Sequence, residues 1–308
     1  MATDNFVRSY GDVSIKEDVV LNAVEILTAQ ETMIFNMLGK TEAISTVHSF
    51  LVDTLKTAAS NAQKEGDDYS YLARSTPTRL TNLIQHIQIP FAVTDTQRSV
   101  EHYQGQDELT RQTEKALKEF ANDAEFNLVR STLVSGASGT APAMSGIIEA
   151  ISKSTNTTAH TSGTAWNATI LDGLVKDNYE NSNGDLATDL FMGSYLRNAT
   201  DDFTQKSNIV VNNPGGLSAI VRTVSTYQTA FSTLNIHTHR YVQQSGDATG
   251  RVLAIRPEKL KVAFLEMPNI DSDVARTGPA TKRAVKASLT LETRNQDSNF
   301  FASGFNIG

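Results

Sequence analysis

Residues 46–94 contain the feature that most restricts how this chain can fold, which is a pair of extended runs separated by a long polar stretch. In the second run apolar and polar residues mostly alternate from Leu83 to Val93, as they do in a β-strand with one buried face. The stretch between the runs, "KTAASNAQKEGDDYSYLARSTPT", has little periodicity and is too long for an ordinary connection inside a compact domain. The pattern predicts a long β-hairpin whose polar tip reaches away from the body.

A hairpin of this kind needs a second surface to lie on. Two isolated strands are marginally stable in water, and the polar tip offers little apolar area of its own to bury. A neighbouring copy of the chain would supply such a surface. We therefore expect the hairpin to make contacts between subunits. The candidate contact residues in it are Phe50, Asp53, Lys56, Lys64, Tyr69, Tyr71 and Arg74.

The segment "GQDELTRQTEKALKEFANDAEFNLVRSTL" predicts one unusually long helix. Its less polar residues recur at helical spacing and form a narrow stripe, with charged residues on the opposite faces. At roughly 28 residues the helix would span about 40 Å, more than twice the average helix length. We expect it to act as the spine of a domain. The residues of the stripe are Leu109, Thr113, Ala116, Leu117, Phe120, Ala124 and Leu128.

The chain closes with "SLTLETRNQDSNFFASGFNIG", which predicts a strand, a polar turn at 295–297 and a second strand. Chain ends are usually poorly ordered unless they are tied into a sheet or docked. We expect this one to be held in the fold as a pair of strands. Phe300, Phe301 and Phe305 would then pack in a core or at a contact with a neighbouring subunit.

The composition excludes several classes of protein. The net charge of −7 does not fit a basic nucleic-acid-binding protein. The chain has no cysteine, so stability has to come from burial or assembly and not from disulfides. No segment approaches the roughly 20 apolar residues of a membrane span. The first residues lack an apolar signal core, so we expect a cytoplasm-like setting.

Only one pair of residues suggests chemistry. His237 and His239, in "NIHTHRY", lie two apart and would share one face of a strand, a geometry that can bind a metal ion. The pair has no recognisable third ligand and no accompanying carboxylate motif. The simpler interpretation is that both side chains lie on an exposed face of the strand or on a face paired in a hairpin. A metal-dependent enzyme that uses His237 and His239 is kept as an alternative. No catalytic, cofactor-binding or metal-binding residue is predicted.

Three segments resemble a known family when they are taken in this order. They are "VEILTAQETMIFNMLGKTEAISTVHSFLVDTL", "GRVLAIRPEKLKVAFLEMP" and "LETRNQDSNFFASGFNI". Together they are similar to the major capsid protein of tailed bacteriophages, which has the Hong Kong 97-like fold. Two positions depart from the pattern, since Met33 stands where proline is usual and Phe50 where tryptophan is usual. The positions in the first segment that carry the resemblance are Thr32, Phe35, Gly39, Lys40, Phe50, Asp53 and Leu55.

The resemblance implies an α+β chain with a particular domain order. An N-terminal arm would occupy residues 1–45 and an extended β-hairpin loop residues 46–95. A peripheral domain with the spine helix would follow at 96–139, and an axial domain at 140–270. Residues 271–308 would return to the peripheral domain as its closing strands.

The resemblance also implies a structural protein and not an enzyme. Subunits would form hexamers and pentamers that close into an icosahedral head shell around double-stranded phage DNA, assembled in the host cytoplasm and retained in the virion. Portal, scaffold, protease and decoration proteins would be possible partners, DNA contacts would be non-specific, and no membrane or cofactor is implied. An encapsulin-like nanocompartment shell, which encloses cargo enzymes, remains the alternative.

Overall fold

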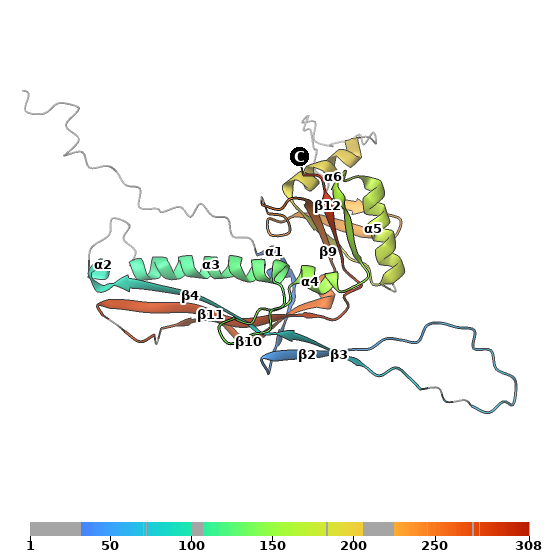
Figure 1. Ribbon diagram of the computed structural model, residues 1–308, viewed down its shortest axis with the longest axis horizontal. Coiled ribbons are helices and arrows are strands. Elements are labelled where there is room, and N and C mark those ends of the chain that lie inside the picture. Colours follow the sequence, from blue (N-terminus) through green and yellow to red (C-terminus); the bar gives the residue numbers. More distant parts are fainter. Residues whose placement is uncertain are drawn as a thin grey trace, which may run out of the picture.

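The computed structural model describes residues 32–69, 71, 73–99, 107–182, 184–205, 225–244, 246–272, 274–276 and 278–307. Residues 1–31, which hold most of the expected N-terminal arm, lie outside the described residues. The described chain forms an elongated lobe, a compact lobe that stands on one end of it, and a hairpin that projects past the compact lobe (Figure 1). The helices are α1 (Met33–Met37), α2 (Asp95–Ser99), α3 (Glu108–Arg130), α4 (Ile147–Ser152), α5 (Ala168–Asn181) and α6 (Ser194–Gln205), with a 3-10 helix η2 (Pro257–Lys259).

The elongated lobe is built on a four-stranded sheet. Its strands, in spatial order, are β1 (Gly39–Glu42), β10 (Leu260–Asp271), β11 (Ala280–Thr293) and β4 (Gln85–Thr94). The first pair is parallel and the other two pairs are antiparallel. The alternation predicted for β4 is present, but the strand pairs with β11 and belongs to this sheet. The expectation that residues up to 95 belong to the projecting loop is therefore wrong for β4.

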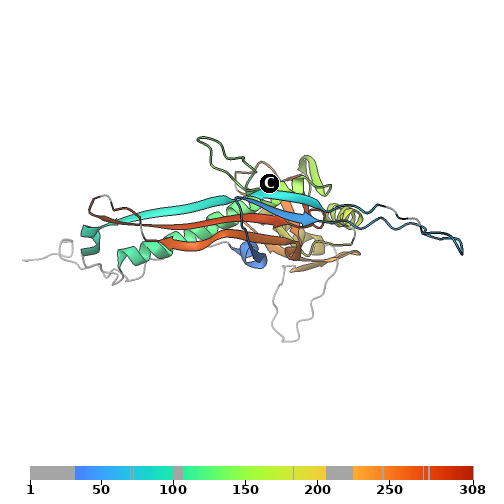
Figure 2. The ribbon, with the colours of Figure 1, turned by 90° about the horizontal axis from the view of Figure 1, so that it is seen from below.

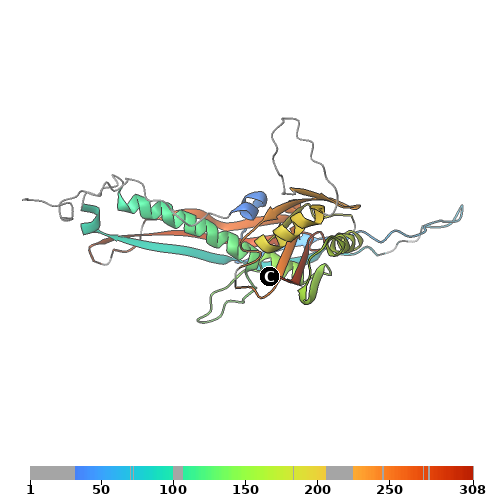
Figure 3. The same ribbon diagram turned by 90° about the horizontal axis from the view of Figure 1, so that it is seen from above.

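The long helix α3 lies along one face of this sheet, as the views from below and above show (Figures 2 and 3). It has 23 residues, or about 35 Å, and is shorter than predicted because Ser131 leaves helical geometry with ψ 139°. The buried stripe includes Leu109, Ala116, Phe120, Ala124 and Leu128, as expected. Leu117, also placed on the stripe, is instead exposed.

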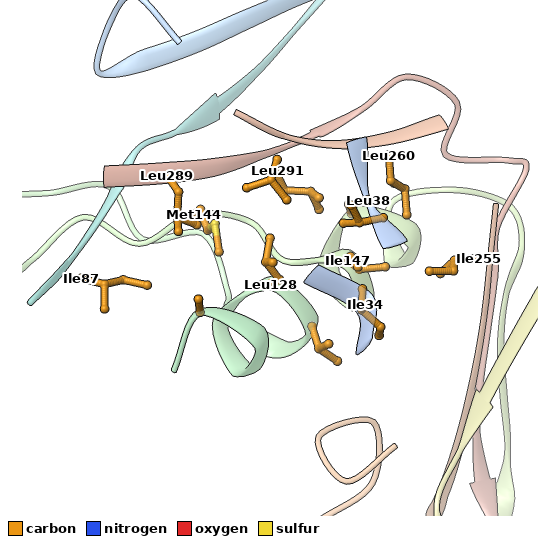
Figure 4. Close-up of a cluster of buried hydrophobic side chains, with 14 of the residues drawn as sticks. Ile34, Leu38, Ile87, Leu128, Met144, Ile147, Ile255, Leu260, Leu289 and Leu291 are labelled. Carbon is orange, nitrogen blue, oxygen red and sulfur yellow. The ribbon is translucent and has the colours of Figure 1, made fainter. Parts of the chain in front are cut away.

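The core of the elongated lobe collects side chains from segments far apart in the sequence (Figure 4). Ile34 and Leu38 enter it from α1 and the residue after it. Leu128 comes from α3, Ile147 from α4 and Leu289 from β11. All five are at most 3% exposed, and at about 25 cal/mol per Å² of buried apolar area such side chains provide the main stabilisation of the lobe. The short helix α1 is therefore fixed by packing, although five residues alone would not form a stable helix.

The compact lobe contains a mixed six-stranded sheet flanked by α5 and α6 (Figure 1). Its own core includes Trp166, Leu171, Leu190 and Phe305. The N-terminus of α5 is capped by Asn167, whose Oδ1 accepts the backbone N–H of Ile170 at 3.0 Å. The strands in spatial order are β5 (Thr157–Thr164), β12 (Phe300–Phe305), β9 (Gly250–Ile255), β6 (Asp189–Met192), β8 (Thr233–Thr238) and β7 (Thr226–Gln228).

The closing strand does not lie where it was expected. β12 is inserted between β5 and β9 in the compact lobe, so it does not pair with β11 beneath α3. The turn after β11 crosses from one lobe to the other and is held by buried amides. Asn178 Nδ2 donates to the carbonyl of Asp297 at 2.9 Å, and Asn299 Oδ1 accepts the N–H of Arg256 at 2.8 Å. β12 is held on both sides because it is an interior strand of the second sheet.

An ion pair joins the C-terminal end of α3 to the loop before β9. Arg130 donates through both terminal nitrogens to Asp247, at 3.0 and 2.8 Å, and the backbone N–H of Gln244 donates to the same carboxylate at 2.8 Å. Burial alone would raise the pKa of Asp247. The bonds from Arg130 and Gln244 and the charges of Arg251 and Arg130 outweigh burial and lower this pKa below its ordinary value.

We expect Asp247→Asn to lower the free energy of unfolding by about 2 kcal/mol at neutral pH, because the mostly buried Arg130 loses its charged partner. A lowered folded-state pKa stabilises the fold above the unfolded value of about 4, and this contribution is lost as pH falls through the folded-state pKa. Urea unfolding of the unassembled subunit between pH 3 and 7 measures both effects, with Asp177→Asn as an exposed control. A difference that stays constant down to pH 3 would contradict this assignment.

None of the helices in the described ranges combines the length and the apolar composition needed to cross a membrane.

Candidate assembly surfaces

The projecting hairpin is formed by β2 (Val47–Val52) and β3 (Thr78–Leu83), which pair in antiparallel register from Val47 opposite Leu83 to Val52 opposite Thr78. Its base rests on the face of the four-stranded sheet that points away from α3 (Figure 1). Ile84, directly after β3, packs there with Ala43 and Ala263 in a small buried cluster. A surface of the chain's own sheet therefore supports the base, as an otherwise marginal hairpin requires.

One buried amide fixes the base of the hairpin to the body. Asn82 Nδ2 donates to the carbonyls of Leu291 at 2.8 Å and Ser145 at 3.1 Å, and Asn82 Oδ1 accepts the N–H of Ser145 at 2.9 Å. The side chain thus links β3 to β11 and to the segment before α4. Buried amides that are satisfied in this way hold a single geometry, because any shift leaves a polar group without a partner.

A buried carboxylate provides a second attachment. Glu292 on β11 lies 3.2 Å from His48 on β2 and accepts a bond from Arg294 at 2.6 Å. Burial alone would raise the pKa of Glu292, but the bonds and charges of Arg294 and His48 lower it. The base of the hairpin is therefore held by packing, by an amide and by a charged group.

Beyond Val52 and Thr78 the hairpin changes character. Every described residue from 53 to 77 is exposed. The tip also has hydrogen bonds of its own, from Ser75 Oγ to the carbonyl of Thr54 at 3.0 Å and from Asp67 N–H to the carbonyl of Lys64 at 3.2 Å. The tip extends well past the compact lobe (Figures 1 and 2). It presents large apolar side chains to solvent, with Leu55, Tyr69 and Tyr71 at 99%, 89% and 93% exposure.

The structure separates the predicted contact residues into two groups. In the hairpin, Phe50 is half-buried, with its ring centre 6.1 Å from that of His48. The others in the hairpin, Asp53, Lys56, Lys64, Tyr69, Tyr71 and Arg74, are exposed on the tip.

The second group has to be corrected. Phe300, Phe301 and Phe305 are at most 8% exposed and belong to the cores of this chain. Phe305 packs edge-on against Trp166, with ring centres 4.8 Å apart. They are therefore unavailable to a neighbouring subunit, because removing them from the core would cost their burial energy.

The two histidines do not form a metal site. His237 Nε2 lies 3.1 Å from Asp189 and His239 Nε2 lies 2.8 Å from Glu125, so each ring has its own carboxylate partner. Over the described residues, no group of three or more histidine, cysteine, aspartate or glutamate side chains is placed to hold a metal ion. The histidines connect elements within the fold.

Sequence reasoning missed Asn82, Glu125 and Glu292, which attach the hairpin and α1 to the body. Asn82 and Glu125 are polar residues within otherwise apolar patterns, which is a weak signal, whereas Glu292 begins a polar run and carries no such signal. Glu125 follows Ala124 and precedes Leu128 by one helical turn, so it lies at the edge of the buried stripe of α3. A polar residue at such a position indicates a buried partner, but the pattern does not say which one.

Three solved structures share the architecture of this chain. The capsid of the native GTA particle matches with a TM-score of 0.68 at 11% identity, covering 99% of this chain and 100% of that one. The capsid of Myoviridae phage XM1 gives 0.61 at 10% identity, over 94% and 97%. The holo-SrpI encapsulin complex from Synechococcus elongatus PCC 7942 gives 0.59 at 12% identity, over 93% of each chain. At these identities the likeness establishes the fold, which is the Hong Kong 97-like capsid fold.

The family follows from the sequence. The model of the SU10 major capsid protein matches residues 3–305, nearly the whole chain. This chain therefore belongs to the SU10 major capsid protein family. It is a structural protein of the virion whose copies assemble into an icosahedral shell, and it is not an enzyme. A search of curated proteins gives no match.

Proposed function

We propose that copies of this chain form hexamers and pentamers around double-stranded phage DNA, and that the hairpin tip is a principal contact between neighbouring copies. The observation that carries the proposal is the contrast between the two parts of the hairpin. Its base is fixed by Asn82 and Glu292, whereas its tip exposes Leu55, Tyr69 and Tyr71 to solvent. Exposed aromatic and apolar side chains on a rigidly supported extension are typical of a surface that is buried in an assembly.

The charge of the chain limits how it would contact the packaged genome. With a net charge of −7, few phosphates would be neutralised per subunit. Binding to DNA would therefore be weak, non-specific and strongly reduced by salt. Portal, scaffold, protease and decoration proteins are further candidate partners of such a shell, by analogy with tailed phages.

One alternative keeps the shell but changes its contents. The likeness to the encapsulin complex, with a TM-score of 0.59, favours a nanocompartment as the second candidate. Neighbouring genes for a portal, a protease and a terminase would support the phage head. A neighbouring gene for a cargo enzyme would support the compartment. Particles purified from the natural source would contain nuclease-resistant DNA in the first case and protein cargo in the second.

Electron microscopy of the expressed full-length chain tests the assembly proposal directly. We expect closed particles, or rings and capsomers of five and six subunits. Salt, subunit concentration and temperature should be varied, because assembly depends on concentration and on screening of charge. A preparation that remains monomeric under every condition would rule out self-assembly by this chain alone.

A further inference from the structure

The most unusual group outside the hairpin is Glu125, a carboxylate on α3 with no exposed surface. It accepts three hydrogen bonds from parts of the chain that are far apart in the sequence. Oε1 accepts the N–H of Ile34 at 2.7 Å and faces His239 Nε2 at 2.8 Å, and Oε2 accepts the N–H of Phe35 at 2.7 Å. A buried carboxylate is tolerated only when such donors replace water.

The hydrogen bonds of His239 define which of its ring nitrogens carries the proton. The backbone N–H of Tyr241 donates to Nδ1 at 3.2 Å, so Nδ1 acts as an acceptor. Nε2 then carries the hydrogen and donates to Glu125. The ring is also fixed in place by its neighbours, with the rings of Phe191 and Tyr241 at 5.9 and 5.7 Å.

The two N–H groups that reach Glu125 belong to the first turn of α1. These are donors that a helix cannot satisfy internally. Thr32, at the N-cap position, makes no side-chain capping bond. Glu125 performs that role from another helix, about ninety positions along the chain. The position of α1 thus depends on α3, and through His239 on the compact lobe.

We propose that Glu125 is a positioning residue that fixes where the N-terminal segment, residues 1–31, joins the body, and couples that point to the compact lobe through His239. α1 directly follows Thr32, where the described chain begins, and His239 directly follows β8 in the compact lobe. A displacement of His239 removes one of the three donors to this buried carboxylate, so Glu125 shifts and its two bonds to α1 are disturbed. Movement of the compact lobe is therefore transmitted to the start of α1.

Hydrogen–deuterium exchange at the amides of Ile34 and Phe35 in the full-length chain tests the coupling. In Glu125→Gln, an NH₂ group replaces one oxygen and faces a backbone N–H, so exchange should quicken at least about tenfold. In His239→Asn, the shorter side chain no longer reaches Glu125, and exchange at Ile34 and Phe35 should quicken about three- to tenfold. His239→Gln places a donor near the position of Nε2 and should restore slow exchange.

His237→Asn is the matched control. It makes the same substitution two residues earlier, but His237 is bonded to Asp189 and should leave exchange in α1 within about twofold of the parent. The double variant of Glu125→Gln and His239→Asn should exchange no faster than Glu125→Gln alone, because both changes remove the same link. Equal exchange in His239→Asn and His237→Asn would overturn the coupling. That comparison stands even if Glu125→Gln does not fold, and it does not depend on whether shells form.

Discussion

Gly304→Ala should be among the most destabilising single substitutions in this chain, lowering the free energy of unfolding by about 4 kcal/mol. Gly304 has φ +97°, a backbone region that costs an L-residue about 1–2 kcal/mol. A methyl group at this position would also overlap the backbone carbonyl of His160 on β5. Backbone atoms in a central sheet cannot move aside as a flexible side chain can. Denaturant unfolding of the unassembled subunit measures the loss.

Two other glycines separate the causes of this loss. Gly163 also has a positive φ, of +89°, but an added methyl group would meet nothing within 4 Å. Gly163→Ala should therefore show the backbone cost alone, about 1 kcal/mol. Gly173 lies within α5 and is open to a methyl group, so Gly173→Ala should stabilise the subunit by about 0.5–1 kcal/mol. If Gly304→Ala and Gly163→Ala cost the same, the close approach of β12 to His160 is not what requires the glycine.

Shortening the hairpin should have the largest effect on assembly. Replacing residues 54–76 with an Asn-Gly turn should lower the yield of closed particles at least tenfold, because the exposed tip side chains that we assign to the subunit contact are removed. The subunit itself should unfold within about 1 kcal/mol of the parent, since every described residue removed is exposed. Asn-Gly is a turn that suits a short hairpin. Electron microscopy and size-exclusion chromatography measure assembly, and circular dichroism measures folding.

Two point substitutions test the same contact without shortening the chain. Tyr69→Ser combined with Tyr71→Ser should weaken assembly several-fold, because aromatic side chains are enriched among the residues that dominate interfaces. Tyr195→Ser, which removes an exposed tyrosine from α6, is the control for losing a tyrosine as such. Normal shells from the shortened chain would refute the role assigned to the tip.

The local elements were predicted well because each carries its own periodic signal. The stripe from Leu109 to Leu128 is a property of a single segment, and so is the alternation from Leu83 to Val93. The polar stretch between residues 56 and 78 likewise indicated a projection without reference to any other segment. The predicted boundaries of elements were less accurate. The helix α3, for example, ends at Arg130 because Ser131 leaves helical geometry, and the sequence gives no strong signal for this.

The attachments were not predictable, because they join residues separated by tens or hundreds of positions. Asn82 and Glu292 hold the hairpin base through Leu291 and His48. In the sequence each has a leucine on one side and a threonine on the other, so neither is marked by a distinctive local pattern. Such a residue shows that a partner must exist if the site is buried. Its partner is set by the tertiary fold, since any of many donors and acceptors would satisfy it.

For the closing strand β12, the sequence predicts the strand but not the sheet to which it belongs. Its aromatic content and its place after a polar turn predicted by themselves that residues 300–305 form a strand, because both are local properties. Only the tertiary structure decided that this strand pairs with β5 and β9 in the compact lobe, and that Phe300 and Phe305 are core residues and not contacts. The physical reason is that backbone hydrogen bonds are the same for every strand. The choice of sheet therefore depends on packing between distant segments, here on the close approach of Gly304 to His160 and on the buried amides that hold the preceding turn.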